Sequence, residues 1–156
     1  MAKNPRPAVF FGFDPGRSGA VAVSLGKSIT TQPMKCGQLP YEVHTWADTT
    51  AFAFIVIERS TSKTPMFRAH RANAKDLEGA MRGLFARRNK IIFVDPRTWQ
   101  SDLGVHHPDK PHQKRAQGSY VAYSIEHLGG LASHSQDEHA ARCILHWAIK
   151  TGAWGC

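Results

Sequence analysis

The fold class is indicated by one stretch near the N-terminus, residues 8–25, which has the sequence AVFFGFDPGRSGAVAVSL. Its first apolar run ends at Asp14-Pro15-Gly16, and this combination is typical of a buried strand that stops at a turn. A second apolar run follows, and Gly26-Lys27 then favours a hairpin turn into residues 29–31. The sequence therefore predicts three antiparallel strands at the start of the chain.

Strands and helices alternate along the rest of the chain. Residues 52–57, FAFIVI, form a continuous apolar run that predicts a strand covered on both faces and ending at Glu58. Small and apolar residues at helical spacing predict a helix over about 66–88. The remaining expected elements are a strand at 91–94 and helices at 116–128 and 136–150. We therefore expect an α/β fold, with a five-stranded mixed sheet flanked by helices in three layers.

Length and charge narrow the function classes. The length of 156 residues predicts a single domain, 1–156, with a short flexible N-terminus, 1–7. The 20 Lys and Arg exceed the 12 Asp and Glu by eight, and a net charge of +8 favours a polyanionic partner such as nucleic acid. No apolar stretch approaches a membrane span or a signal core, so a cytoplasmic protein is expected. The three cysteines lack the spacing of a zinc knuckle or a disulfide scaffold.

The few acidic residues stand at informative positions. Asp14 and Glu58 each follow an apolar strand directly, and parallel neighbouring strands would open both carboxylates at one sheet edge. Asp137 and Glu138 begin the last predicted helix, close enough to His134 for a shared helical face. Converging carboxylates favour Mg²⁺, which prefers oxygen ligands, and paired ions of this kind cleave phosphodiesters. Each acid also has a purely structural interpretation, as a turn former, a surface ion pair or a first-turn helix residue.

Several segments resemble one family. Residues 12–19, GFDPGRSG, resemble the first motif of the RuvC-type Holliday junction resolvases of the RNase H-like superfamily, and residues 55–58, IVIE, resemble their second. Residues 77–83 are similar to the long helix that follows, and residues 95–100, DPRTWQ, resemble a Pro-x-x-Trp element of phage-type members. The resemblance spans roughly 8–149 and implies an RNase H-like three-layer domain. The first motif also opens actin-like ATPases, which need two such domains.

The last motif departs from the family pattern. The family usually has two acids three residues apart, whereas Asp137 is followed at that spacing by Ala140. Some members instead carry a histidine three residues before the final aspartate, which His134 and Asp137 match. The resemblance implies a catalytic set of Asp14, Glu58, His134 and Asp137, and a metal-binding set of Asp14, Glu58, Asp137 and Glu138. The choice between His134 and Glu138 as fourth ligand stays open.

The resemblance also implies a reaction. It is the metal-dependent hydrolysis of four-way DNA junctions by paired symmetric cuts, with two Mg²⁺ ions for which Mn²⁺ would substitute. One ion would activate the attacking water and the other would stabilise the leaving 3′-oxygen. The implied setting is DNA recombination and repair in the bacterial cytoplasm or nucleoid, with a phage gene as one source. The alternatives are another RNase H-like nuclease, acting on flaps or RNA–DNA hybrids, and a catalytically silent junction-binding module.

Two surfaces follow from the same resemblance. The expected DNA-binding residues flank two loops and are Lys63, Phe67, Arg68, Arg71, Lys110, Lys114 and Arg115. Phe67 has two interpretations, a wedge that stacks on bases or an anchor against the core. A homodimer is expected through helix 66–88, because a two-fold junction calls for a two-fold enzyme. Its small residues Ala72, Gly79, Ala80 and Gly83 form a stripe that suits close packing against a second copy or against the sheet.

Overall fold

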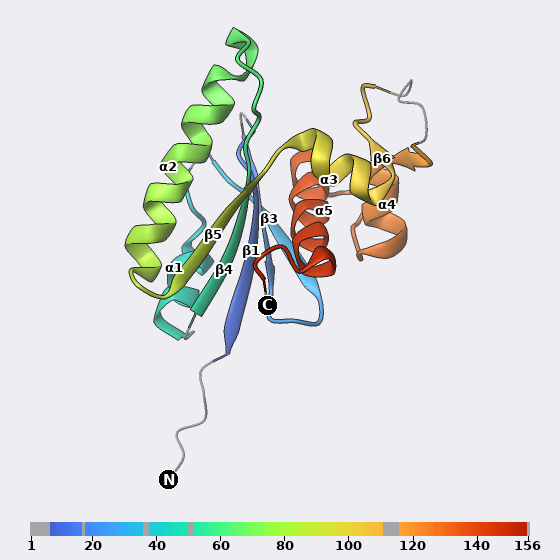
Figure 1. Cartoon of the computed structure of the whole chain (residues 1–156). Helices are drawn as coiled ribbons and strands as arrows, with labels where there is room; N and C mark the ends of the chain where they lie inside the picture. The colour runs from blue at the N-terminus through green and yellow to red at the C-terminus, as the bar shows by residue number, and fades with distance from the viewer. Residues whose placement is uncertain (1–6, 17, 36–37, 50–51, 111–115, 156) are drawn as a thin grey trace.

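A five-stranded mixed sheet forms the centre of the computed structural model (Figure 1). The structure describes residues 7–16, 18–35, 38–49, 52–110 and 116–155, so the expected flexible N-terminus lies outside them except for Pro7. The strands are β1 (Ala8–Asp14), β2 (Ala20–Ser24), β3 (Ile29–Pro33), β4 (Phe52–Glu58) and β5 (Asn89–Val94). Their order is β3-β2-β1-β4-β5. β2 is antiparallel to β1 and β3, whereas β4 is parallel to β1 and β5.

Helices cover both faces of the sheet (Figure 1). One face carries α1 (Tyr41–Thr49) and α2 (Arg68–Phe85), which follows the 3-10 turn η1 (Pro65–Phe67). The other face carries α5 (Gln136–Thr151), with α3 (Pro96–Leu103) and α4 (Tyr120–His127) packed beside it. The two-residue strands β6 (Val105–His106) and β7 (Gly118–Ser119) pair in parallel between α3 and α4. None of the helices in the described residues is long and apolar enough to cross a membrane.

Burial on both faces explains the apolar runs of β1 and β4. In β4, Ile55 and Ile57 pack against α1 and α2, while Val56 between them packs on the α5 side. In β1, Phe11 and Phe13 point to the α2 side and are fully buried. Because neither face of these strands meets water, the alternation of polar and apolar residues that marks a half-exposed strand is absent. The predicted three-layer α/β arrangement with a five-stranded mixed sheet is confirmed.

Gly12 sets how closely α5 approaches the sheet. A Cβ at this position would lie 2.7 Å from Leu145 Cβ and 3.0 Å from the carbonyl oxygen of Ala141. Both contacts are closer than van der Waals packing allows, and the second atom belongs to helix backbone that cannot rotate away. α5 therefore rests directly on the β1 backbone at Gly12.

Gly12→Ala is expected to destabilise the fold by about 1–3 kcal/mol, because the methyl group must push α5 away from β1. For a domain of this size the melting temperature should fall by roughly 3–10 °C in a thermal unfolding experiment. Gly118→Ala is the matched control, since no described atom lies within 4 Å of the Cβ it would add. Equal melting temperatures for wild type and Gly12→Ala would contradict the close packing of α5.

Candidate active site

Asp14 and Glu58 are the last residues of neighbouring parallel strands. Asp14 ends β1 and Glu58 ends β4, and the preceding residues Phe13 and Ile57 are paired in the ladder. Because the strands are parallel, their carboxyl ends meet at the same edge of the sheet. Both acids are only 7% exposed. The sheet therefore holds two nearly buried carboxylates side by side.

Asp137 joins this pair from the first turn of α5. The backbone N–H of Gly19 donates to Asp137 Oδ2 over 3.2 Å, and that of Gly16 donates to Asp14 Oδ1 over 3.0 Å. A Cβ on Gly16 would lie 3.3 Å from Oδ1 of both aspartates. Because Gly16 has no Cβ, there is space beside the two carboxylates. The backbone of Gly16 holds Asp14, and that of Gly19 holds Asp137.

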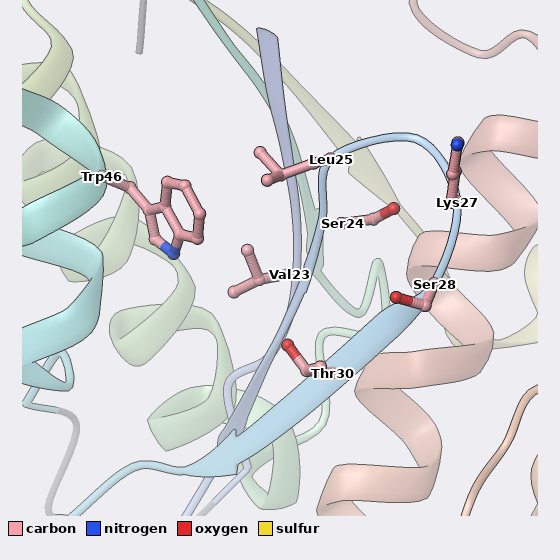
Figure 2. Close-up of a pocket in the computed structure, with 7 residues that line it drawn as sticks. All are labelled: Val23, Ser24, Leu25, Lys27, Ser28, Thr30 and Trp46. Carbon is pink, nitrogen blue, oxygen red and sulfur yellow. The ribbon is translucent and has the colours of Figure 1, made fainter. Parts of the chain in front are cut away.

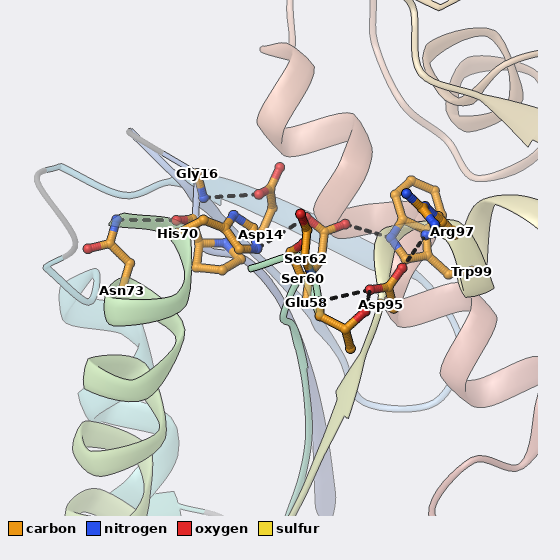
Figure 3. A network of polar contacts seen from close by, with 12 residues as sticks. Asp14, Gly16, Glu58, Ser60, Ser62, His70, Asn73, Asp95, Arg97 and Trp99 are labelled. Carbon is orange, nitrogen blue, oxygen red and sulfur yellow. Dashed lines mark hydrogen bonds and ion pairs between the residues drawn. The ribbon is translucent and has the colours of Figure 1, made fainter. Parts of the chain in front are cut away.

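His70 is the fourth group at this edge. It lies in the first turn of α2, and its Nε2 is 3.7 Å from Glu58 Oε1 (Figure 3). Asp14, Glu58 and His70 each offer one potential ligand atom, and these atoms all lie within 4.8 Å of one another. Nε2 of His70 is buried and has no hydrogen-bond partner among the described residues. Mixed oxygen and nitrogen donors thus converge here.

The carboxylates are strongly perturbed by their surroundings. Burial raises the pKa of Asp14 well above its ordinary value, and the nearby charges of Glu58 and Asp137 raise it further. Burial also raises the pKa of Glu58 to about 7, although a hydrogen bond from Trp99 acts in the opposite direction. Carboxylates gathered in this way repel one another when all are charged. The cluster is therefore stabilised by bound protons or by a cation.

Burial lowers the pKa of the His70 imidazole. The ring is consequently neutral at pH 7, and its approach to Glu58 is not an ion pair under those conditions. A neutral imidazole carries a lone pair on one of its ring nitrogens. In this form His70 can donate electrons to a metal ion.

A second layer of residues holds Glu58 in place. The buried Trp99 donates from Nε1 to Glu58 Oε2 over 2.6 Å. Asp95, which caps the N-terminus of α3, accepts hydrogen bonds from the backbone N–H and the hydroxyl of Thr61 over 2.9 Å and 2.7 Å (Figure 3). The loop after β4 is therefore tied to the start of α3. These contacts fix the direction of the Glu58 side chain.

His134 and Glu138 make other contacts. His134 lies before the first residue of α5, so the spacing rule of a helix does not apply to it, and its Nδ1 accepts from the backbone N–H of Leu131 over 3.1 Å. Glu138 is part of a capping box with Ser135, and its Oε2 accepts from the Thr31 hydroxyl over 3.1 Å. Neither side chain belongs to the group formed by Asp14, Glu58 and His70.

The expected DNA-binding residues differ in exposure. Lys63, Arg68 and Lys110 are exposed, whereas Arg71 is half-buried and donates to the carbonyl oxygen of Ser62. Phe67 is half-buried and packs edge-on against the His70 ring, with 6.5 Å between centroids. Lys114 and Arg115 lie outside the described residues.

His70 and Trp99 are the site residues that the sequence did not reveal as such. His70 was visible only as one basic residue after the Glu58 loop, and Trp99 only as part of a motif. Each lies in the first turn of a helix that follows an acidic residue at the end of a strand. This position is the signal that could have identified them. Their roles depend on contacts between elements, which spacing along the chain does not encode.

A hollow of about 420 Å³ lies between the β2–β3 hairpin and α1 (Figure 2). Its described lining residues are Val23, Ser24, Leu25, Lys27, Ser28, Thr30 and Trp46. Ser24 is paired with Phe10, near the start of β1, whereas Asp14 ends that strand. The hollow is thus at the opposite end of the sheet from the acidic cluster.

Comparison with known structures supports the fold. The chain is similar to RuvC of T. thermophilus, solved in complex with a Holliday junction substrate, with 13% sequence identity and a TM-score of 0.53. The match covers 94% of this chain and 96% of that chain. At this identity the similarity shows the fold alone, and it confirms the predicted RNase H-like architecture. No protein-family model and no curated protein matches the sequence.

Proposed function

We propose that this chain is a structure-selective endodeoxyribonuclease that resolves four-way DNA junctions by paired symmetric hydrolysis. The observation that carries the proposal is the convergence of Asp14, Glu58 and Asp137 at one edge of an RNase H-like sheet. The Holliday junction substrate of the T. thermophilus structure supports the choice of substrate.

The residues present suit divalent metal ions. The carboxylates of Asp14 and Glu58 and the unpartnered Nε2 of His70 form a donor set that a cation would satisfy. Asp137 and the space left by Gly16 lie beside Asp14. We propose that Asp14, Glu58 and Asp137 would hold two ions, Mg²⁺ or in its place Mn²⁺, since Asp14 neighbours both other acids. Such ions supply an activated water and stabilise the leaving oxygen.

The chain itself supplies orientation. The Trp99 hydrogen bond holds one oxygen of Glu58, and the Gly19 N–H holds one oxygen of Asp137. Glu138 is held by its cap and by Thr31, which makes it the weaker candidate for a fourth ligand. His134, in the loop directly before α5, is proposed to transfer protons in the reaction.

Basic residues near the site suit contact with phosphates. Exposed Lys63 lies in the loop after Glu58, and exposed Arg68 begins α2. The other proposed contacts are Arg71, Lys110 and, outside the described residues, Lys114 and Arg115. Such contacts position DNA without reading its sequence. The packing of Phe67 on His70 favours its interpretation as an anchor for the start of α2 over that as a wedge between bases.

The small-residue stripe of α2 supports a homodimer. Ala72, Gly79, Ala80 and Gly83 are exposed, whereas the face of α2 that packs on the sheet consists of Ala74, Leu77, Met81 and Phe85. The stripe therefore does not cover the sheet, and a second copy could pack on it. We propose a two-fold dimer through α2, with 1–156 acting as one domain, so that two sites face the two strands to be cut.

The proposed phage-type assignment rests on the resemblance of the Pro-x-x-Trp element. Its Trp99 bonds directly to Glu58, which gives this element a role in the site and supports assignment to the phage-type resolvases. We propose that the protein acts in DNA recombination and repair in the bacterial cytoplasm or nucleoid.

The test uses labelled four-way, flap, duplex and RNA–DNA hybrid substrates with Mg²⁺, Mn²⁺ or EDTA. Paired symmetric nicks confined to the junction, and lost in EDTA, are the expected result. Preferential cutting of flaps or hybrids would instead favour another RNase H-like nuclease. Tight junction binding without cutting in either metal would overturn the proposal in favour of a binding module.

A further inference from the structure

The nitrogen donor of His70 distinguishes this cluster from a site built of carboxylates alone. We propose that His70 ligates a metal ion through Nε2, together with Asp14 and Glu58, and that it makes this position favour Mn²⁺ and related transition ions over Mg²⁺. The inference rests on the proposed function only in that both require a metal ion at this sheet edge.

The missing hydrogen-bond partner of His70 Nε2 is the first observation that supports metal binding. Buried polar atoms almost always have a hydrogen-bond partner, and an exception needs an explanation such as a bound ion. Nε2 of His70 is buried without such a partner among the described residues. Its 3.7 Å separation from Glu58 Oε1 is too long for a direct hydrogen bond. A metal ion between the two atoms would satisfy both.

The distances support a shared ion. Two atoms that each lie about 2.1 Å from one ion are at most roughly 4.2 Å apart. The 3.7 Å between Nε2 and Glu58 Oε1 falls within this limit. The ligand atoms of Asp14, Glu58 and His70 lie within 4.8 Å of one another, so only a small side-chain movement would close the group.

The surroundings of His70 hold its ring toward the acids. Phe67 packs edge-on against it, and the neighbouring Arg71 bonds to the Ser62 carbonyl, which ties the start of α2 to the loop after Glu58. Figure 3 shows the ring on the α2 side of the cluster, next to Asp14 and Glu58. A ligand that is already oriented loses little conformational freedom when it binds.

The donor chemistry determines the preferred ion. Mg²⁺ takes oxygen ligands and retains waters, whereas imidazole suits first-row transition ions. A position with two carboxylates and one imidazole should therefore bind Mn²⁺ and Co²⁺ more tightly than Mg²⁺. An all-oxygen position that uses Asp137 would show less discrimination.

The test measures metal binding without DNA. In electron spin-echo spectra of the Mn²⁺-loaded protein we expect modulation from a coordinated ¹⁴N nucleus, and we expect His70→Gln to abolish it. Calorimetric titration of His70→Gln should show Mn²⁺ affinity reduced by about tenfold or more, with a much smaller change for Mg²⁺. His44→Gln, at an exposed histidine on α1, is the matched control and should retain the nitrogen modulation.

Persistence of the modulation in His70→Gln, or its loss in His44→Gln, would overturn the assignment. A measurement on the wild type guards against misfolding of the variant: in protein with ¹⁵N-labelled histidine, Zn²⁺ should shift the His70 Nε2 resonance. No shift at His70 would also count against it. Metal binding through His70 without junction cleavage would overturn the proposed function alone, whereas cleavage without a nitrogen ligand would overturn this inference alone.

Discussion

Asp14→Asn is expected to reduce metal-dependent junction cleavage by about a thousandfold, the upper range for loss of one group that stabilises charge in the transition state. The reason is the position of Asp14 between Glu58 and Asp137, whose charges both act on its pKa. Loss of this carboxylate weakens both proposed metal positions, while the amide keeps the size of the side chain. Single-turnover rates on a labelled junction, in Mg²⁺ and in Mn²⁺, measure the effect.

Binding provides the internal control for this variant. In EDTA, Asp14→Asn should bind the junction as tightly as wild type or more tightly, because a negative charge near the phosphates is gone. Asp48→Asn makes the same change at an exposed position on α1 and should cut at the wild-type rate. Wild-type cleavage by Asp14→Asn would remove the basis of the proposed function.

Glu58→Gln is expected to stabilise the metal-free protein at high pH. Burial raises the pKa of Glu58 from 4.5 to about 7, so the folded state binds this proton more tightly than the unfolded state does. Wild type therefore loses stability as the pH rises from 4.5 through about 7. The shift corresponds to roughly 3 kcal/mol. The glutamine of the variant does not titrate. Relative to wild type, the free energy of unfolding of Glu58→Gln should therefore be higher by up to that amount at pH 8 and almost equal near pH 4.

Urea unfolding in EDTA across this pH range measures the difference between the two proteins. The difference reports the shift of Glu58 together with the part of the Asp14 shift that the Glu58 charge causes, and both act in the same direction. The lowered pKa of His70 acts in the opposite direction. Glu42→Gln, an exposed change on α1, should show no such pH dependence. In saturating Mn²⁺ wild type should be more stable than Glu58→Gln, because the ion binds the wild-type cluster more tightly. A difference that does not vary with pH would contradict the raised pKa.

The fold was predictable where the hydrophobic pattern is strong. The apolar runs of β1 and β4 and the helical periodicity of α2 and α5 indicated the sheet and its covering helices. The strands β6 and β7 were not predicted, since two residues carry no periodicity. α2 begins two residues later than expected because Pro65–Phe67 form a separate 3-10 turn.

The candidate site was predictable in part. Asp14 and Glu58 follow their strands directly, and Asp137 begins a helix, so each stands at an element boundary that the sequence marks. The contacts of His70 and Trp99 with Glu58 join different elements, and no local pattern encodes them. The cap that engages Glu138 is a local contact, yet the bond from Thr31 that also holds it comes from a distant strand.

The close packing of α5 on Gly12 determines when the candidate site is completed during synthesis of the chain. α5 carries Asp137 and is synthesised after the whole sheet, and a domain generally folds as one unit. Asp14 and Glu58 are therefore synthesised long before Asp137, and the three carboxylates come together only when α5 is complete and packs on β1. If the chain cuts DNA as proposed, this activity would arise only after α5 has packed on β1, and incomplete chains would not cut.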